Sequence, residues 1–233
     1  MVGLKMNSDF EQSVAYLRER LGLPLPGRDA YMLMAPQNPG HRVVAVARAE
    51  GCREGGVLAL LYPVEGQAHL VLTVRSESLR THAGQISLPG GRIDPGEDAM
   101  QAALREAWEE LGIVREELDI LGTLSELYIP PSNFCLTPVV AATHRRPDFK
   151  PHDAEVAALI EAPMALLADP ATIHEEMRFI LGEERRVPYF LLGTHKVWGA
   201  TAMILAELVV LWREMQGATT DDGQPTTAND ERQ

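Results

Sequence analysis

The chain has 233 residues, 45% of them hydrophobic, and a formal net charge of −12 at pH 7. This composition is ordinary for a globular protein with a real core, and the acidic charge excludes a general nucleic-acid binder, which needs a basic surface to replace phosphate counterions. Cys52 and Cys135 are its only cysteines, too few for a disulfide framework, so we expect two buried apolar side chains and a reducing, cytoplasmic setting.

The start of the chain and its most apolar stretch predict no membrane partner. The first residues, MVGLKMNSDFEQSV, lack the basic and then apolar run of a signal peptide. Residues 197–212 form the most apolar run, but it is shorter than the ~20 residues of a spanning helix and contains Glu207. We therefore expect a buried helix there, with part of it available for a homodimer contact.

Residues 1–42 are predicted to form a helix and an irregular connector. Ser8 followed by Glu11 has the form of a capping box, and Phe10, Val14 and Leu17 then recur at helical intervals, so we expect a helix that ends near residue 21. Residues 23–42 contain prolines and glycines at short intervals, which favours an irregular segment that packs on the main domain.

Residues 43–215 are predicted to form one domain in which strands and helices alternate. Valine- and leucine-rich segments bounded by turn residues predict strands at 43–49, 56–64, 69–74, 120–127, 134–142, 154–160, 177–181 and 187–192. Helices are expected at 97–111, at 163–167 with Pro163 in the first turn, and at 197–215. This order predicts an α/β fold with a mixed sheet between helical layers. Residues 216–233 contain no large apolar side chain, so we expect a mobile tail.

The helix expected at 97–111 carries acidic residues on one face. Turning each residue by ~100° groups Glu106, Glu109 and Glu110 opposite an apolar stripe, and a turn is expected before it at Gly90 and Gly91. Like charges at these spacings repel each other, so the helix face favours a bound cation. Carboxylates suit Mg²⁺ or Mn²⁺, which keep water and bind substrate phosphates. An ordinary solvated acidic face is the alternative.

The stretch around these glutamates resembles the signature of the Nudix hydrolases. The matching residues are Gly91, Glu97, Arg105, Glu106, Ala107, Glu109, Glu110, Gly112 and Ile113. Ala107 is small where the family pattern more often has a larger aliphatic side chain. The resemblance implies an α/β/α sandwich that hydrolyses a nucleoside diphosphate linked to another group.

The resemblance also implies roles for individual residues. We expect Glu106 and Glu110 to be the principal metal ligands, with Glu109 assisting and the Gly91 carbonyl nearby. Arg105 and Glu97 are expected to orient these carboxylates. The general base stays open among three acidic residues, which are Glu109, Glu126 and Glu155. Zinc is not expected, because no histidine is paired at a ligand spacing with another histidine or a cysteine.

Residues 70–92 form a locally basic segment upstream of the acidic helix. Arginines suit phosphate because they offer forked donors, so we expect substrate contacts from Arg75, Arg80, Arg92 and His82. The segment also resembles the extra motif of the coenzyme A pyrophosphatase branch of the Nudix family. The matching residues are Leu72, Thr73, Arg75, Ser76, Arg80, Gly84, Gln85, Pro89, Gly90 and Gly91, while Val71 and Leu88 depart from the motif.

This second resemblance implies hydrolysis of coenzyme A or a derivative to phosphopantetheine and adenosine 3′,5′-bisphosphate. Two other substrate classes share the Nudix signature, namely ADP-ribose or another nucleotide sugar, and oxidised nucleoside triphosphates. A different class of protein is a non-catalytic Nudix module that senses a nucleotide. Such modules typically lose the signature glutamates, whereas this chain retains Glu97, Glu106, Glu109 and Glu110.

Overall fold

The computed structural model describes residues 6–38, 43–76, 84–180 and 182–221. Its helices are α1 (Met6–Leu21), α2 (Arg28–Tyr31), α3 (Val44–Ala49), α4 (Ala99–Leu111), α5 (Met164–Ala168) and α6 (Gly199–Asp221). Its strands are β1 (Arg53–Val64), β2 (Gln67–Arg75), β3 (Ile86–Ser87), β4 (Gly90–Arg92), β5 (Asp119–Thr123), β6 (Leu127–Ile129), β7 (Phe134–Ala142), β8 (Val156–Pro163), β9 (Ile173–Ile180), β10 (Glu183–Leu192) and β11 (His195–Trp198). Short 3₁₀ turns are Met32–Met34, Arg115–Glu117, Pro130–Ser132 and Pro170–Thr172.

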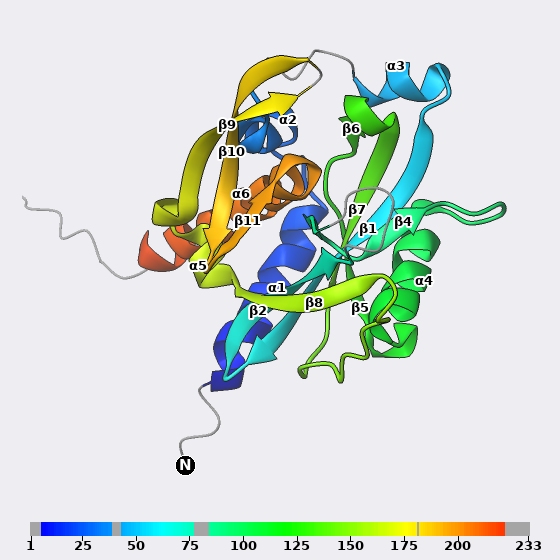
Figure 1. The fold of residues 1–233 in the computed structure, drawn as a ribbon. Coiled ribbons are helices and arrows are strands. Elements are labelled where there is room, and N and C mark those ends of the chain that lie inside the picture. The colour runs from blue at the N-terminus through cyan, green and yellow to red at the C-terminus, as the bar shows by residue number, and fades with distance from the viewer. Residues whose placement is uncertain (1–5, 39–42, 77–83, 181, 222–233) are drawn as a thin grey trace, which may run out of the picture.

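A mixed sheet lies between helical layers, which confirms the predicted fold class. Strands β1 and β7 are parallel, and the other pairs of this sheet are antiparallel. Helix α4 covers one face of the sheet, and helices α1 and α6 pack against the other (Figure 1). A second sheet of β9, β10 and β11 lies beside α6 in the order β11-β10-β9 (Figure 1).

The two central strands separate at one end of the main sheet. The pairing of β1 with β2 covers Leu61 to Val64, close to the turn that joins them. At the other end, β4 pairs with β1 and β3 pairs with β2. The segment that carries the predicted glycine turn is thus part of the sheet, because Gly90 and Gly91 lie on β4 opposite Val57 and Gly56. This end of the sheet lies directly under α4.

Most predicted elements are present, but Val44–Ala49 form helix α3 where a strand was predicted at 43–49. Val43 and Val46 are 55% and 46% exposed, so this segment is not an interior strand. Arg48 anchors α3 by donating hydrogen bonds to Glu54 and Glu126. The valine-rich sequence favoured a strand because propensity ignores such tertiary contacts.

Other elements also differ from the sequence prediction, and β9 and β10 both begin four residues earlier than predicted. The segment predicted as one strand at 120–127 is divided into β5 and β6. Helix α6 continues past Met215 to Asp221, and β11 precedes it without having been predicted. No helix in the described ranges has both the length and the apolar character needed to cross a bilayer.

The two cysteines form a disulfide bond, which corrects the expectation of two unpaired side chains. Cys135 lies on β7 opposite Glu54 of β1, and Cys52 directly precedes β1. This register brings their Cα atoms to 6.0 Å, within disulfide range. The cytoplasmic setting stays a prediction. The disulfide bond removes the argument for it that was based on unpaired cysteines.

Close packing of α4 on β1 depends on Gly56, and this generates a prediction. A Cβ atom at Gly56 would lie 1.8 Å from the carbonyl oxygen of Ala99 at the start of α4. We expect Gly56→Ala to lower the free energy of unfolding by about 3 kcal/mol or more, because α4 must shift away from the sheet. Denaturant unfolding measures this change.

The matched control is Gly22→Ala, whose new Cβ would come no closer than 3.3 Å to the Glu19 carbonyl oxygen. This variant should unfold within about 1 kcal/mol of the wild type. Equal stability of the two variants would contradict the packing described for α4.

Candidate active site

Helix α4 begins and ends where its sequence specifies. Asp98 is the N-cap, and its carboxylate accepts from the backbone of Gln101 while the Gln101 amide oxygen accepts from the backbone of Asp98. Gly112 ends the helix at φ 69°, a left-handed conformation that glycine adopts without strain. Leu104, Ala107 and Leu111 are buried against the sheet as predicted. The glutamates therefore have fixed positions relative to β4.

Glu106 lies directly against the backbone of β4. A Cβ atom at Gly91 would lie 2.3 Å from Glu106 Oε1, so only glycine leaves room for this carboxylate. Burial raises the pKa of Glu106, and the hydrogen bond from Arg105 opposes that rise. Glu109 and Glu155 raise it further through charge repulsion. Glu106 is thus a half-buried carboxylate in an acidic environment.

Glu110 is more deeply buried than the predicted acidic face implied. It is 3% exposed, and within the described residues its buried Oε2 atom has no hydrogen-bond partner. Burial raises the pKa of Glu110 to about 7, against the opposing charge of Arg75, and Glu106 and Glu155 raise it further. A backbone hydrogen bond from Gly90 favours the charged form. Burial of a carboxylate oxygen without a hydrogen-bond partner lowers the stability of the folded state, unless a ligand binds to that oxygen.

Arg75 lies inside this site, at the end of β2. Its Nη1 atom is 3.8 Å from Glu110 Oε1, and among the described residues its buried Nε atom has no hydrogen-bond partner. The side chain is 26% exposed. Arg75 was predicted to contact substrate phosphate, and the structure places its guanidinium beside an expected metal ligand. The two roles are compatible, because phosphate would bridge a cation and an arginine.

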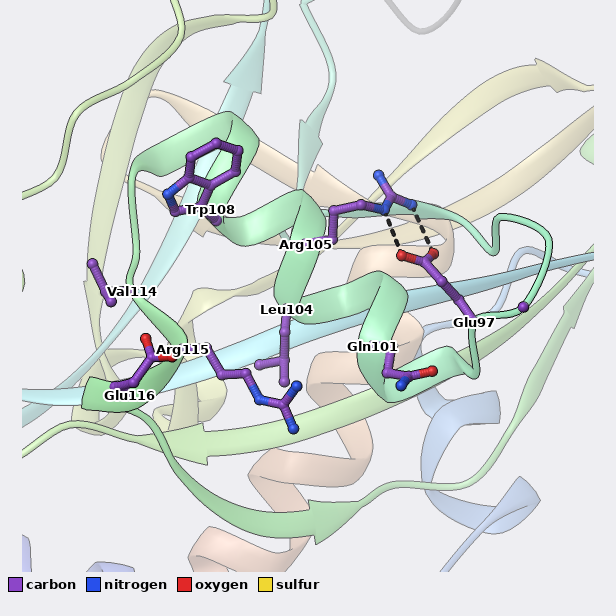
Figure 2. Close-up of a pocket in the computed structure, with 9 residues that line it drawn as sticks. Glu97, Gln101, Leu104, Arg105, Trp108, Val114, Arg115 and Glu116 are labelled. Carbon is purple, nitrogen blue, oxygen red and sulfur yellow. Dashed lines mark hydrogen bonds and ion pairs between the residues drawn. The ribbon is translucent and has the colours of Figure 1, made fainter.

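Arg105 links four parts of the site through its guanidinium. It makes a two-pronged contact with Glu97, with Nε 2.9 Å from Oε1 and Nη2 3.2 Å from Oε2 (Figure 2). Its Nη1 atom donates to Glu106 at 2.8 Å and to Glu109 at 3.3 Å. Its Nη2 atom also donates to the carbonyl of Arg92 on β4. These contacts fit the positioning role predicted for Arg105 and Glu97.

Glu109 and Arg92 are more exposed than the two buried carboxylates. The Glu109 side chain is 47% exposed and contacts Arg105. The Arg92 side chain is exposed. The Gly91 carbonyl oxygen would lie 2.6 Å from a Cβ atom on Gly55, so it lies against β1. Arg80 and His82 fall outside the described residues.

The candidate general bases Glu126 and Glu155 have different surroundings. Glu126 accepts hydrogen bonds from Arg48 and Thr137, and the Arg48 contact lowers the pKa of Glu126. This contact disfavours proton abstraction. Glu155 instead lies close enough to Glu106 and Glu110 to raise the pKa of both carboxyl groups.

Backbone hydrogen bonds fix the position of Glu155. The Glu110 carbonyl accepts from the backbone of His152, and the His152 carbonyl accepts from the backbone of Glu155. The Glu155 carbonyl in turn accepts from the backbone of Ser76, just after β2. Sequence reasoning could not find these links, because they join three distant segments.

Glu106 and Glu110 fit a divalent cation that completes its coordination shell with water and substrate. In the part of the chain that the structure describes, no cluster of three or more His, Cys, Asp or Glu side chains converges as a complete cage. Mg²⁺ usually takes only one or two carboxylates and completes its shell with water and phosphate. Glu106 and Glu110, one helical turn apart and with a partnerless Oε2 atom on Glu110, fit that requirement.

A surface pocket of about 490 Å³ lies beside α4, and its lining includes the 61% exposed Trp108 together with Val114 and Arg115 (Figure 2). Glu97 and Arg105 line one end of it. Glu106 and Glu110 do not line it, so this pocket is separate from the buried carboxylates.

Comparison with known proteins supports the resemblance in the sequence. The NUDIX domain model matches residues 53–177. The chain is 34% identical over 153 residues to a protein of Photorhabdus laumondii named uncharacterized Nudix hydrolase NudL, covering 64% of this chain and 81% of that protein. It is 31% identical over 171 residues to Nudix hydrolase 3 of Caenorhabditis elegans, covering 66% of this chain and 71% of that protein.

Among solved structures, the Nudix hydrolase RenU from M. smegmatis is similar, with a TM-score of 0.47 and 20% identity over 84% of this chain and 98% of that chain. The family model spans more than half of the present sequence, and the relatives above are matched over more than two thirds of their length. The chain therefore belongs to the Nudix hydrolases, a family of pyrophosphohydrolases that act on small molecules containing a diphosphate.

Proposed function

We propose that this protein hydrolyses the diphosphate of coenzyme A or a derivative, giving phosphopantetheine and adenosine 3′,5′-bisphosphate. The observation that carries the proposal is the buried Glu110 carboxylate beside Arg75. Glu110 belongs to the Nudix signature, and Arg75 belongs to the upstream segment that resembles the coenzyme A branch. Their contact brings the two sequence features into one site.

Glu106 and Glu110 are the proposed ligands of Mg²⁺ or Mn²⁺, and Glu109 assists from the exposed side. When bound, the cation would polarise the diphosphate and favour ionisation of water. Arg105 holds Glu106 and Glu109 in place through hydrogen bonds from one nitrogen. Glu97 fixes Arg105 from the opposite side, so a change at either residue alters the metal site indirectly.

Arg75 is the proposed contact for a substrate phosphate. Its guanidinium borders Glu110 and retains a buried Nε donor that no described residue accepts from. A phosphate oxygen would satisfy that donor and offset the desolvation of the guanidinium. Arg80, His82 and Arg92 stay predictions from sequence.

Glu155 is the proposed general base. Among the three candidates it lies near both buried carboxylates and has no ion pair with a described arginine or lysine that would hold it in place as Arg48 holds Glu126. It would take a proton from the water that attacks phosphorus.

A substrate panel tests the proposed function. Wild-type protein with Mn²⁺ is incubated with coenzyme A, ADP-ribose and oxidised dGTP, and products are separated by chromatography. We expect phosphopantetheine and adenosine 3′,5′-bisphosphate to form fastest. Glu110→Gln keeps the shape but loses the charge, so its kcat should fall by about a thousandfold or more while it stays folded. A preference for ADP-ribose or oxidised dGTP would contradict the coenzyme A assignment.

The pKa of Glu110 predicts how metal-free stability depends on pH. Because the folded protein raises this pKa from 4.5 to about 7, the folded state binds the proton more tightly than the unfolded chain. Its contribution is therefore complete below pH 4.5 and is lost as pH rises through 7. The loss should amount to at most about 3 kcal/mol.

Denaturant unfolding in a chelator between pH 5 and 8 measures this dependence. Glu110→Gln has no proton to lose and should show a flatter profile, with higher stability than the wild type at the alkaline end. Parallel profiles for the two proteins would show that Glu110 is not the group responsible.

The role of Glu155 predicts a kinetic effect of its own. Glu155→Gln should lower kcat by about a hundredfold, because an amide cannot accept the proton of the attacking water. Glu126→Gln serves as the comparison and should keep kcat near the wild-type value, because Glu126 is held by Arg48. If Glu155→Gln keeps the kcat of the wild type, another group accepts the proton.

A further inference from the structure

A second pocket lies at the junction of the main sheet and the three-stranded sheet. It has a volume of about 450 Å³ and is lined by Gly84, Gln85, Ile86, Arg178, Thr194, His195, Lys196 and Trp198. The first three residues belong to β3 and its preceding turn, and the others to β9, β11 and the turn before β11. The lining contains cationic side chains and no carboxylate.

The two sides of this pocket are fixed to each other. The Thr201 hydroxyl at the start of α6 donates to the carbonyl of Ile86 on β3 at 3.1 Å. Because β11 leads directly into α6, this hydrogen bond also positions β11 beside β3. The pocket is therefore part of the folded scaffold.

The chemistry of the pocket suits a nucleoside that carries a phosphate. The Arg178 guanidinium lies 4.1 Å from the centroid of the Trp198 ring, which makes a planar, cationic surface for stacking. Glu176 forms ion pairs with both Arg178 and Lys196 and holds them on the same side of the sheet. The Lys196 side chain is still 43% exposed, so its ammonium group can reach a ligand.

The turn that lines one side of the pocket is hydrogen-bonded to the backbone of Arg75. The backbone N–H of Arg75 donates to the Gln85 carbonyl at 2.9 Å, and the backbone N–H of Gly84 donates to the Arg75 carbonyl at 3.0 Å. Gln85 thus lines the pocket and lies about one strand spacing, ~5 Å, from the residue whose guanidinium contacts Glu110. A substrate bound at Arg75 through its diphosphate would extend into this pocket by passing over Gln85.

We infer that this pocket binds the adenosine end of the substrate, with the base beside Arg178 and Trp198 and the 3′-phosphate near Lys196. The inference rests on the proposed coenzyme A activity. The cationic lining matches the anionic nucleotide end of that molecule, whereas the neutral pantetheine arm offers no group for Lys196 or Arg178 to neutralise. Lys196 thereby determines specificity for the 3′-phosphate, Arg178 contributes to binding of the base, and neither side chain takes part in the chemical step.

Kinetics with two substrates test the inference. We measure kcat and KM for coenzyme A and for 3′-dephospho-coenzyme A in the wild type, Lys196→Gln and Arg178→Gln. Lys196→Gln should raise KM for coenzyme A about tenfold, change KM for 3′-dephospho-coenzyme A by less than about twofold, and leave kcat unchanged. Arg178→Gln should raise KM for both substrates by a similar factor, because both carry the base. Equal changes in KM for the two substrates in Lys196→Gln, or no change with either, would overturn the inference.

Arg186→Gln is the matched control. Arg186 lies on β10 opposite Met177, so its side chain is on the face of the sheet away from Arg178, and it forms a surface ion pair with Glu175. This variant should leave both KM values unchanged. Arg178→Gln loses the contact with Trp198 and could fail to fold, in which case Lys196→Gln decides the result.

Direct binding separates this inference from the proposed function. If the wild type does not cleave coenzyme A, the proposed function fails, and the pocket is tested by calorimetric titration with adenosine 3′,5′-bisphosphate. Binding that is about tenfold weaker in Lys196→Gln than in Arg186→Gln would support the pocket. Equal affinity of the two variants, or no binding by the wild type, would overturn it.

Discussion

The burial of two glutamates of one helix against the backbone of one short strand is the constraint on which the site depends. Glu106 fits because Gly91 has no side chain, and Glu110 is almost completely enclosed. The fold therefore concentrates negative charge where solvent cannot stabilise it, and the pKa of both carboxyl groups rises. Stability alone would favour neutral side chains at these positions. A carboxylate pair retained under this cost is well suited to a cation that arrives with a phosphate-bearing substrate.

Arg105 and Arg75 compensate this negative charge in different ways. Arg105 forms hydrogen bonds with Glu97, Glu106 and Glu109, so its positive charge is used mainly to position these carboxylates. The contact of Arg75 with Glu110 is longer, at 3.8 Å, and no described residue accepts from its buried Nε atom. The Arg75 guanidinium can therefore turn toward a phosphate without breaking a short hydrogen bond to a described carboxylate. The polar pocket lined by Gln85 lies next to the backbone of Arg75, so it is available for the distal part of a nucleotide that is bound at Arg75.

The central helix and the core strands could be predicted because their sequence patterns are local. The apolar stripe of α4 and the valine-rich segments of β1, β2 and β7 each specify one element. Contacts between distant segments could not be predicted in this way. Cys52 is close enough to bond to Cys135 because of the register between β1 and β7. Arg48 anchors helix α3, Val44–Ala49, through a contact with Glu54 on β1. The same contacts engage Glu126 and leave Glu155 near the buried carboxylates, a distinction that residue type alone cannot make.

The most direct measurement of the central claim is calorimetric titration of Mn²⁺ into the wild type, Glu106→Gln and Glu110→Gln, with an exposed glutamate variant, Glu116→Gln, as the reference. If the two buried carboxylates hold the cation, each of their variants should bind Mn²⁺ at least about tenfold more weakly than the wild type, and Glu116→Gln should bind it equally well. Wild-type affinity in both Glu106→Gln and Glu110→Gln would contradict the account.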